Sequence, residues 1–441
     1  MASAFVQSFA ELAPDILAAM PGSGLPWLDA FRRGQLDAFV RDGLPGTRSE
    51  AWKYTTLRAL ERRAFRPGDS DAAIRDVDAA CLQLEGVDGP RLVFVHGVFR
   101  PDLSTLDDLP PGLTLQPLSQ ALAEDAEPLR FMLTRGEAQA ADAFTRLNAA
   151  LAGDGMVLRV AGHARIDVPV HLLQVGAPAG EDLAWHARNI VELGEDAALT
   201  LVEHHIGTGT HTHLGTQVSD VVLHARAQLA WVVLQEAPDG ALLFRHDRLR
   251  LDADAQARVH ALELGGALVR HEFDAELRGE GARLDTRGAF LPGGRQHIET
   301  RLDIRHLARH TASDALWRGV ADKRGRGVFH GAITVAEGAD GTDAALSNKN
   351  LLLSPHAEID TQPVLEIYAD EVMAAHGATV GQFDERSLFY LRSRGIPADA
   401  ARTLLTLAFC RAALDDIGNE VLREHLGKRL AARLPADGET A

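Results

Sequence analysis

The sequence predicts a mainly β protein in which a β-solenoid core is flanked by helical segments at both ends. Over residues 155–365, apolar and polar residues alternate with the period of two that is typical of strands. Before residue 154 and after residue 381, apolar residues recur instead at helical spacing. With 441 residues, the chain is long enough for more than one such part.

Residues 1–154 are expected to form an N-terminal domain of helices with a few short strands. Residues 5–20 and 28–40 have the apolar spacing of amphipathic helices, and a Pro-Gly-Ser-Gly segment separates them. Residues 92–99 form an apolar run that predicts two short strands around a turn. A third helix is expected over 138–152, ending at Gly153-Asp154-Gly155.

Residues 155–381 are expected to form the β core, for which a barrel, a sandwich and a solenoid are the candidate architectures. Two observations favour the solenoid. The strands are short and are separated by tight turns at residues 194–196 and 279–281. A polar turn followed by an alternating strand also recurs loosely, without the Asn-Gly hairpin signals of a meander.

Residues 382–434 are expected to form a C-terminal helical domain, and residues 435–441 a disordered tail. Helices are predicted over 384–392, 397–414 and 417–434, with Pro397 in the first turn of the second. The apolar side of that second helix is assigned to Leu404, Leu407, Ala408, Phe409 and Ala412.

Charge and composition limit the class of partner. The chain has 45 Lys and Arg residues against 62 Asp and Glu residues, a net charge of −17, which argues against nucleic acid. No signal peptide and no apolar run of membrane-spanning length is found, so a soluble cytoplasmic protein without a membrane partner is expected. Two cysteines, Cys81 and Cys410, cannot form a zinc knuckle or hold an iron–sulfur cluster unaided.

Four histidines form the densest group of potential metal ligands: His204, His205, His211 and His213. On a strand, the last two would share a face, as metal ligands do. The intervening glycine and threonine favour a surface loop instead, and no glutamate follows the His-x-His pair closely.

Other motifs do not identify an enzyme. Residues 319–331 are rich in glycine and basic residues but lack a P-loop pattern and a following helix, so a turn between solenoid rungs is expected. The pairs Asp107-Asp108 and Asp415-Asp416 are expected to be solvated. No nucleophile–base pair is found.

His376 lies where the predicted strands give way to the C-terminal helices, directly before Gly377. An imidazole is a good ligand for borderline metals, although the residues by themselves favour a hydrogen-bonded corner histidine.

Several segments resemble the SufD branch of the SufB/SufD family of iron–sulfur cluster assembly proteins. The most specific is HGATVG at 376–381, followed by LFYLRSRGI at 388–396. Further similar segments are NKNLLLS at 348–354, LEIYAD at 365–370, HLARHT at 306–311, FHGAI at 329–333 and RSEAWKYT at 48–55. The SufB branch would carry more cysteines and a different segment around the FYL motif.

The resemblance implies a right-handed parallel β-helix with helical domains at both ends. It also implies a scaffold without enzymatic activity that pairs with SufB through the β-helix and binds the ATPase SufC through the C-terminal helices. The isolated chain would hold no tightly bound cofactor and could form a homodimer, whereas a transient cluster would form in the complex with SufB.

For the site, the resemblance implies that His376 is a cluster or iron ligand at the SufB interface. Many relatives have Cys-Ser-His where this chain has Ala374-Ala375-His376, so His376 would act without the neighbouring thiol. Two other classes stay open from the residues themselves. One is a carbohydrate-active β-helix enzyme, and the other is an oxygenase with a metal on the four grouped histidines.

Overall fold

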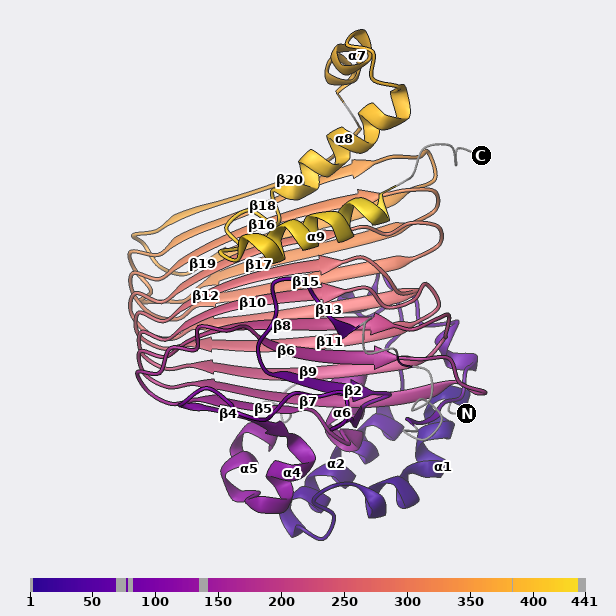
Figure 1. Ribbon diagram of the computed structural model, residues 1–441, viewed down its shortest axis with the longest axis vertical. Helices are drawn as coiled ribbons and strands as arrows, with labels where there is room; N and C mark the ends of the chain where they lie inside the picture. The colour runs from indigo at the N-terminus through magenta and orange to yellow at the C-terminus, as the bar shows by residue number, and fades with distance from the viewer. Residues whose placement is uncertain (1–2, 69–76, 78–81, 135–141, 383, 435–441) are drawn as a thin grey trace.

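The computed structural model describes residues 3–68, 77, 82–134, 142–382 and 384–434. Its core is a β-solenoid of two parallel sheets, with helices packed below the first turns and projecting above the last (Figure 1). The prediction of a mainly β solenoid with helices at both ends is therefore confirmed.

The two sheets take alternate strands of the chain, so each turn of the solenoid crosses from one sheet to the other. The first sheet contains β1 (Arg66–Pro67), β4 (Leu113–Pro117), β5 (Met156–Val160), β7 (Leu183–Leu193), β9 (Leu214–Leu223), β11 (Leu242–Leu251), β13 (Leu268–Leu277), β15 (His297–His306), β17 (Arg326–Val335) and β19 (Glu358–Ile367). The second contains β2 (Arg91–Val95), β3 (Val98–Phe99), β6 (Val170–Gly176), β8 (Ala198–Gly207), β10 (Gln228–Gln235), β12 (Gln256–Glu263), β14 (Arg283–Phe290), β16 (Ala312–Ala321), β18 (Asp343–Leu352) and β20 (Met373–Gly381).

The strands are longer than the short strands expected from the sequence, since β8, β13 and β18 each span 10 residues. Parallel register stacks equivalent residues directly, as when Leu268 pairs with His297 and His297 with Arg326. Alternate side chains point between the two sheets, where Trp231, Trp317 and Phe273 are almost fully buried. The predicted period of two thus builds one continuous apolar interior.

The corners that lead from the first sheet to the second share a backbone conformation, although no single residue type occupies them all. His163, Asp196, Arg226, Asp254 and His310 all have φ between 56° and 63° there. Backbone bonds join one corner to the next, as from the Asp196 N–H to the Ala225 carbonyl, 3.0 Å away. The turns expected at 194–196 and 279–281 are among these corners.

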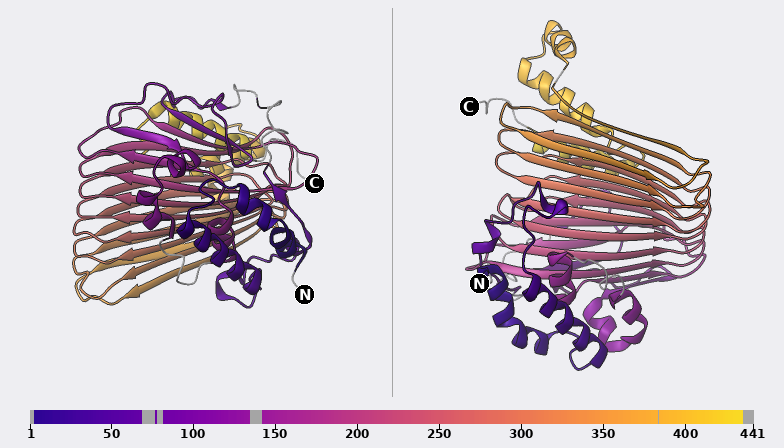
Figure 2. Two further views of the ribbon diagram at one scale, coloured as in Figure 1. Left: turned by 90° about the horizontal axis from the view of Figure 1, so that it is seen from below. Right: turned by 180° about the vertical axis from the view of Figure 1, so that it is seen from behind.

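The N-terminal helices pack against the first turns of the solenoid (Figure 2). Phe5, Phe9 and Phe144 join the aromatic cluster that makes this contact. The helices are α1 (Ala4–Ala19), α2 (Pro26–Asp42), α4 (Leu118–Glu124), α5 (Glu127–Thr134) and α6 (Ala143–Leu151), with the short 3-10 helices η1 (Glu50–Trp52) and η2 (Leu60–Arg62).

These helices agree with the predictions for 5–20 and 28–40, and β2 and β3 form the strand pair predicted at 92–99. The helix predicted over 138–152 is described from Ala143 onward, and residues 135–141 lie outside the described residues.

Three C-terminal helices follow the last strand: α7 (Glu385–Ser393), α8 (Ala398–Arg411) and α9 (Glu420–Arg433). Helix α9 lies along the outer face of the second sheet, whereas α7 projects beyond the end of the solenoid (Figure 1). Pro397 precedes α8 as its N-cap rather than standing in its first turn. The tail predicted at 435–441 lies outside the described residues.

The apolar side predicted for α8 is partly wrong. Leu404 is 49% exposed and Ala408 is also exposed, whereas Ala401, Thr406 and Cys410 are buried. Leu407 and Phe409 do pack against the apolar cluster that α9 forms with the second sheet. Leu404 and Ala408 face solvent because α8 rises beyond the last strands of the solenoid (Figure 1).

Across the described residues, no helix combines the length and apolarity needed to cross a bilayer.

Candidate functional site at the last turn of the solenoid

The solenoid ends in two edge strands, β19 and β20. In the described part of the chain, β19 is followed in its sheet by β17 and β20 by β18, with no strand on the other side. An edge strand presents unpaired backbone donors and acceptors to its surroundings, so this end of the solenoid can accept a further strand.

His376 stands on the row of β20 that continues the solenoid interior. It is aligned with Leu346 of β18, which is 3% exposed and belongs to the core. No described strand stacks beyond β20, and His376 is therefore exposed although its row is buried one turn earlier. The imidazole thus lies at the open mouth of the solenoid.

Alternate backbone N–H groups of β20 point outward, away from β18. The Met373 N–H donates to the Thr342 carbonyl within the second sheet, at 2.9 Å. Because successive N–H groups of a strand alternate in direction, those of Ala374, His376 and Ala378 point away from β18. The histidine side chain and the free edge are presented together.

Two buried asparagines lie one turn below this mouth. Asn350 Nδ2 donates to the Thr379 carbonyl of β20 at 3.0 Å, and Thr361 Oγ1 of β19 donates to Asn348 Oδ1 at 2.8 Å. Both asparagines are at most 2% exposed. They couple the two edge strands to the turn beneath, which gives the 348–354 segment a structural role.

Within the described residues, His376 belongs to no group of three or more side chains that could bind one metal ion. Ala374 occupies the next position on the same row of β20 and adds no ligand. Further ligands for a metal at His376 would have to come from another chain or from the bound species itself.

Beyond this mouth, the C-terminal helices expose large side chains. Phe389 is 73% and Tyr390 is 56% exposed on α7, and Leu404 is 49% exposed on α8. In contrast, the apolar side of α9 is buried, with Leu422, Leu426 and Leu430 at 0% exposure.

The four grouped histidines are not at the surface, and that expectation is wrong. His204 and His205 lie in β8, where they contact Glu236 and Glu203 at 3.3 and 2.6 Å. His211 and His213 do lie in a loop, as expected, but are 7% and 2% exposed. They are buried because their rings stack on each other and pack around Trp185.

The other sequence motifs have the expected settings. The 319–331 segment contains the turn between β16 and β17, and both aspartate pairs are exposed. Cys410 lies within α8, where burial raises the pKa of its thiol to about 12. Cys81 lies outside the described residues.

A charged network inside the solenoid was not anticipated from the sequence. Arg245 lies 2.7 Å from Asp247 and 3.1 Å from Glu203, and His271 contacts Asp247 at 2.9 Å and Glu263 at 3.0 Å. Burial and the Arg245 charge each lower the pKa of His271, but the two carboxylates outweigh them and raise it to about 9. Charges with partners on neighbouring rungs can therefore be buried here.

A second unanticipated group is formed by Asp142, which caps the N-terminus of α6, His246 of β11 and Glu272 of β13. These residues are far apart in sequence, and their meeting depends on strand register, so no local pattern could have revealed it.

Comparisons with known proteins agree with this architecture. Residues 177–409 match the family described as SUF system FeS cluster assembly, SufBD core domain, and residues 6–172 match the SufBD protein N-terminal region. The chain is 33% identical to the iron-sulfur cluster assembly protein SufD of Escherichia coli, over 91% of this chain and 92% of that one. It is 29% identical to a SufBD family protein of Synechocystis over 91% and 90% of the two chains. It is 24% identical to the protein ABCI7, chloroplastic, of Arabidopsis thaliana over 95% and 89%.

The fold and these matches define a class of protein, the β-solenoid proteins of iron–sulfur cluster assembly. The chain belongs to the SufB/SufD family, and within it the chain is SufD-like. The family resemblance inferred from the sequence is thereby confirmed.

Proposed function

We propose that this chain is a non-enzymatic subunit of an iron–sulfur cluster assembly complex, in which it pairs with SufB through the last turn of its solenoid. The observation that carries the proposal is the open end at β20, where an exposed histidine and outward-facing backbone groups occur together. Strand addition at such an edge supplies affinity through backbone hydrogen bonds.

In this proposal, His376 is a ligand of the nascent cluster, which is cargo of the complex. Since Ala374 replaces the usual cysteine, the remaining ligands would come from SufB and from the cluster's own sulfides. A neutral imidazole suits iron in this setting. The isolated chain would then carry no tightly bound cofactor.

A substitution of His376 tests the ligand role. The variant His376→Ala is expected to reduce the yield of cluster on the complex severalfold, because one ligand is lost, while the subunits still co-purify. His356→Ala serves as the matched control, since His356 is also exposed and lies in the turn just before β19. Cluster yield is measured by iron and sulfide content after reconstitution of the co-expressed complex.

Equal yields from wild type and His376→Ala would show that His376 is not a ligand. Loss of SufB from the purified complex would instead assign His376 to docking alone.

The proposal also assigns SufC docking to the exposed side chains of α7 and α8. Phe389 and Tyr390 present aromatic surface on a helix that projects from the solenoid, as a docking element requires. ATP hydrolysis would then occur on SufC. Phe389→Ala is expected to weaken SufC binding at least tenfold in a pull-down titration, because exposed aromatics dominate many interfaces.

Phe131→Ala is the matched control for this experiment. Phe131 is 64% exposed but lies on α5, at the opposite end of the molecule. If both variants bind SufC as the wild type does, docking does not use α7.

A further inference from the structure

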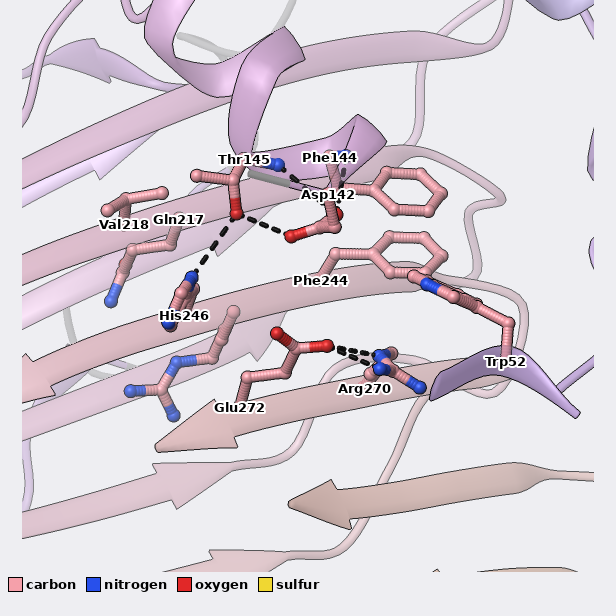
Figure 3. Close-up of a pocket in the computed structure, with 11 residues that line it drawn as sticks. Trp52, Asp142, Phe144, Thr145, Gln217, Val218, Phe244, His246, Arg270 and Glu272 are labelled. Carbon is pink, nitrogen blue, oxygen red and sulfur yellow. Dashed lines mark hydrogen bonds and ion pairs between the residues drawn. The ribbon is translucent and has the colours of Figure 1, made fainter. Parts of the chain in front are cut away.

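Three side chains converge where helix α6 begins over the first sheet (Figure 3). Asp142 precedes α6, His246 lies on β11 and Glu272 on β13. Each offers one ligand atom, and these atoms all lie within 4.8 Å of one another. The three residues line a narrow pocket and are partly buried, so an ion could enter from solvent.

The register of the strands places two of these groups side by side. His246 and Glu272 are aligned partners of β11 and β13, and their side chains point outward from the solenoid toward α6 (Figure 3). Asp142 approaches from the helix side. The pocket therefore joins three separate elements.

A second carboxylate orients the imidazole. His246 Nε2 donates to Asp274 Oδ2 at 2.8 Å, and Nδ1 faces Thr145 Oγ1 at 3.3 Å, on the side of Asp142. The Thr145 hydroxyl donates its own proton to Asp142 Oδ2, so Nδ1 donates in the contact with Thr145 Oγ1. A metal ion bound at Nδ1 would replace that proton, and the carboxylate of Asp274 on the opposite nitrogen would hold the ring in place, as in many metal-bound histidines.

The two carboxylates are also held in place. Asp142 Oδ1 accepts from the Phe144 N–H at 2.7 Å, and Oδ2 accepts from Thr145 Oγ1 at 2.6 Å. Arg270 holds Glu272 through contacts to Oε1 of that carboxylate. The other oxygen, Oε2, takes no part in this ion pair and is the atom that Glu272 would offer to an ion.

The positive charge of Arg270 is balanced by nearby carboxylates, so it does not exclude a cation from the pocket. Its Nη1 lies 2.6 Å from Glu299 Oε2, and its guanidinium stacks on the Trp52 ring at 3.9 Å from the centroid. Glu299 and Glu272 thus share one arginine, and Asp142 and Asp274 add further negative charge around His246.

We propose that Asp142, His246 and Glu272 form a binding site for a divalent first-row metal ion of the Zn²⁺, Co²⁺ or Fe²⁺ type. One imidazole nitrogen with two carboxylate oxygens is a ligand set for borderline metals, and three protein ligands leave an open coordination position. The ion would join α6 to β11 and β13. This site is separate from His376 and does not depend on the assembly role proposed above.

Titration of the full chain with Co²⁺ tests the site, because Co²⁺ reports imidazole and carboxylate coordination in its visible absorption. The wild type is expected to bind one equivalent of Co²⁺ more tightly than any further equivalents, and Zn²⁺ should displace it. Glu272→Gln and His246→Gln should each weaken this step at least about tenfold. Asp142→Asn should do likewise while keeping the N-cap, because asparagine caps helices as well as aspartate does.

His224→Gln is the matched control. His224 also contacts two carboxylates, Glu192 at 3.1 Å and Asp252 at 3.2 Å, but through opposite ring nitrogens, so the three cannot close around one ion. This variant should leave the tightest Co²⁺ equivalent unchanged. Circular dichroism of each variant establishes that it is folded.

The proposal fails if folded Asp142→Asn and Glu272→Gln bind Co²⁺ as wild type does. It also fails if His224→Gln removes the tightest equivalent, which would indicate scattered surface histidines as the ligands.

Discussion

At the scale of single residues, the buried His271 makes stability depend on pH. Its pKa is raised to about 9 in the folded protein, against an ordinary value of 6.5. The stabilisation is fully present below pH 6.5 and is lost as pH rises through about 9. The free energy of unfolding should therefore fall by up to about 1.4 kcal/mol per pH unit in this window.

Denaturant unfolding of wild type and His271→Gln between pH 6 and 10 checks this dependence. The variant should have a flatter profile, because glutamine does not titrate. His306→Gln is the control, since His306 is also buried but has a pKa lowered to about 4 by burial, and it should leave the alkaline slope unchanged. A His271→Gln profile as steep as wild type would refute the assignment.

Of the candidate site residues, the sequence could predict only those that lie in a contiguous motif. His376 was found because a contiguous motif surrounds it, and its place at the open end agrees with a strand-to-helix joint. His246 and Glu272 have no such motif. Their pairing requires the register between β11 and β13, which period-two alternation alone does not specify.

At the scale of elements, the free edge of β20 makes a prediction that separates strand addition from other docking modes. Ala378 has its N–H directed away from β18, so Ala378→Pro removes an outward donor and leaves the ladder to β18 in place. The chain should fold normally, yet its affinity for SufB should fall at least tenfold. Binding is measured by co-purification and by titration calorimetry.

Ala375→Pro is the companion variant. Its N–H points into the sheet, so this change should disturb the last turn itself and lower the unfolding midpoint. Unchanged SufB affinity in a folded Ala378→Pro protein would exclude β20 as the added edge.

The corners between strands explain why the sequence favoured a solenoid without proving it. The repeated feature is a backbone conformation at the corners, where His163, Asp196, Arg226 and Asp254 all have positive φ. His, Asp and Arg all occur at this position, so no single residue type marks the corners. Helical spacing also predicted the helix α8 correctly. It did not predict that Leu404 faces solvent, because that depends on how α8 packs against the rest of the protein.

At the scale of the whole molecule, α9 packs on one flank of the solenoid, where it also contacts the segment around Gly86. Its core residues pack on Val232 and Leu262 of the second sheet, and Asn419 Nδ2 donates to the Gly86 carbonyl at 2.7 Å. Arg429 pairs with Glu236 of the same flank. The C-terminal helix therefore covers apolar sheet surface that water would otherwise reach.

The same substitution, leucine to alanine, made in α9 and in α8 separates this structural role from the docking role proposed for α7 and α8. Leu426→Ala should cost about 2–5 kcal/mol of stability, because Leu426 is fully buried between α9 and the sheet. Leu404→Ala removes the same atoms from an exposed position on α8, and it should leave the unfolding midpoint nearly unchanged while weakening SufC binding. Thermal unfolding and hydrogen exchange in α9 measure the first effect, and a pull-down titration measures the second. Equal destabilisation by both variants would mean that α8 and α9 pack as one unit, and the exposed side of α8 would then be structural.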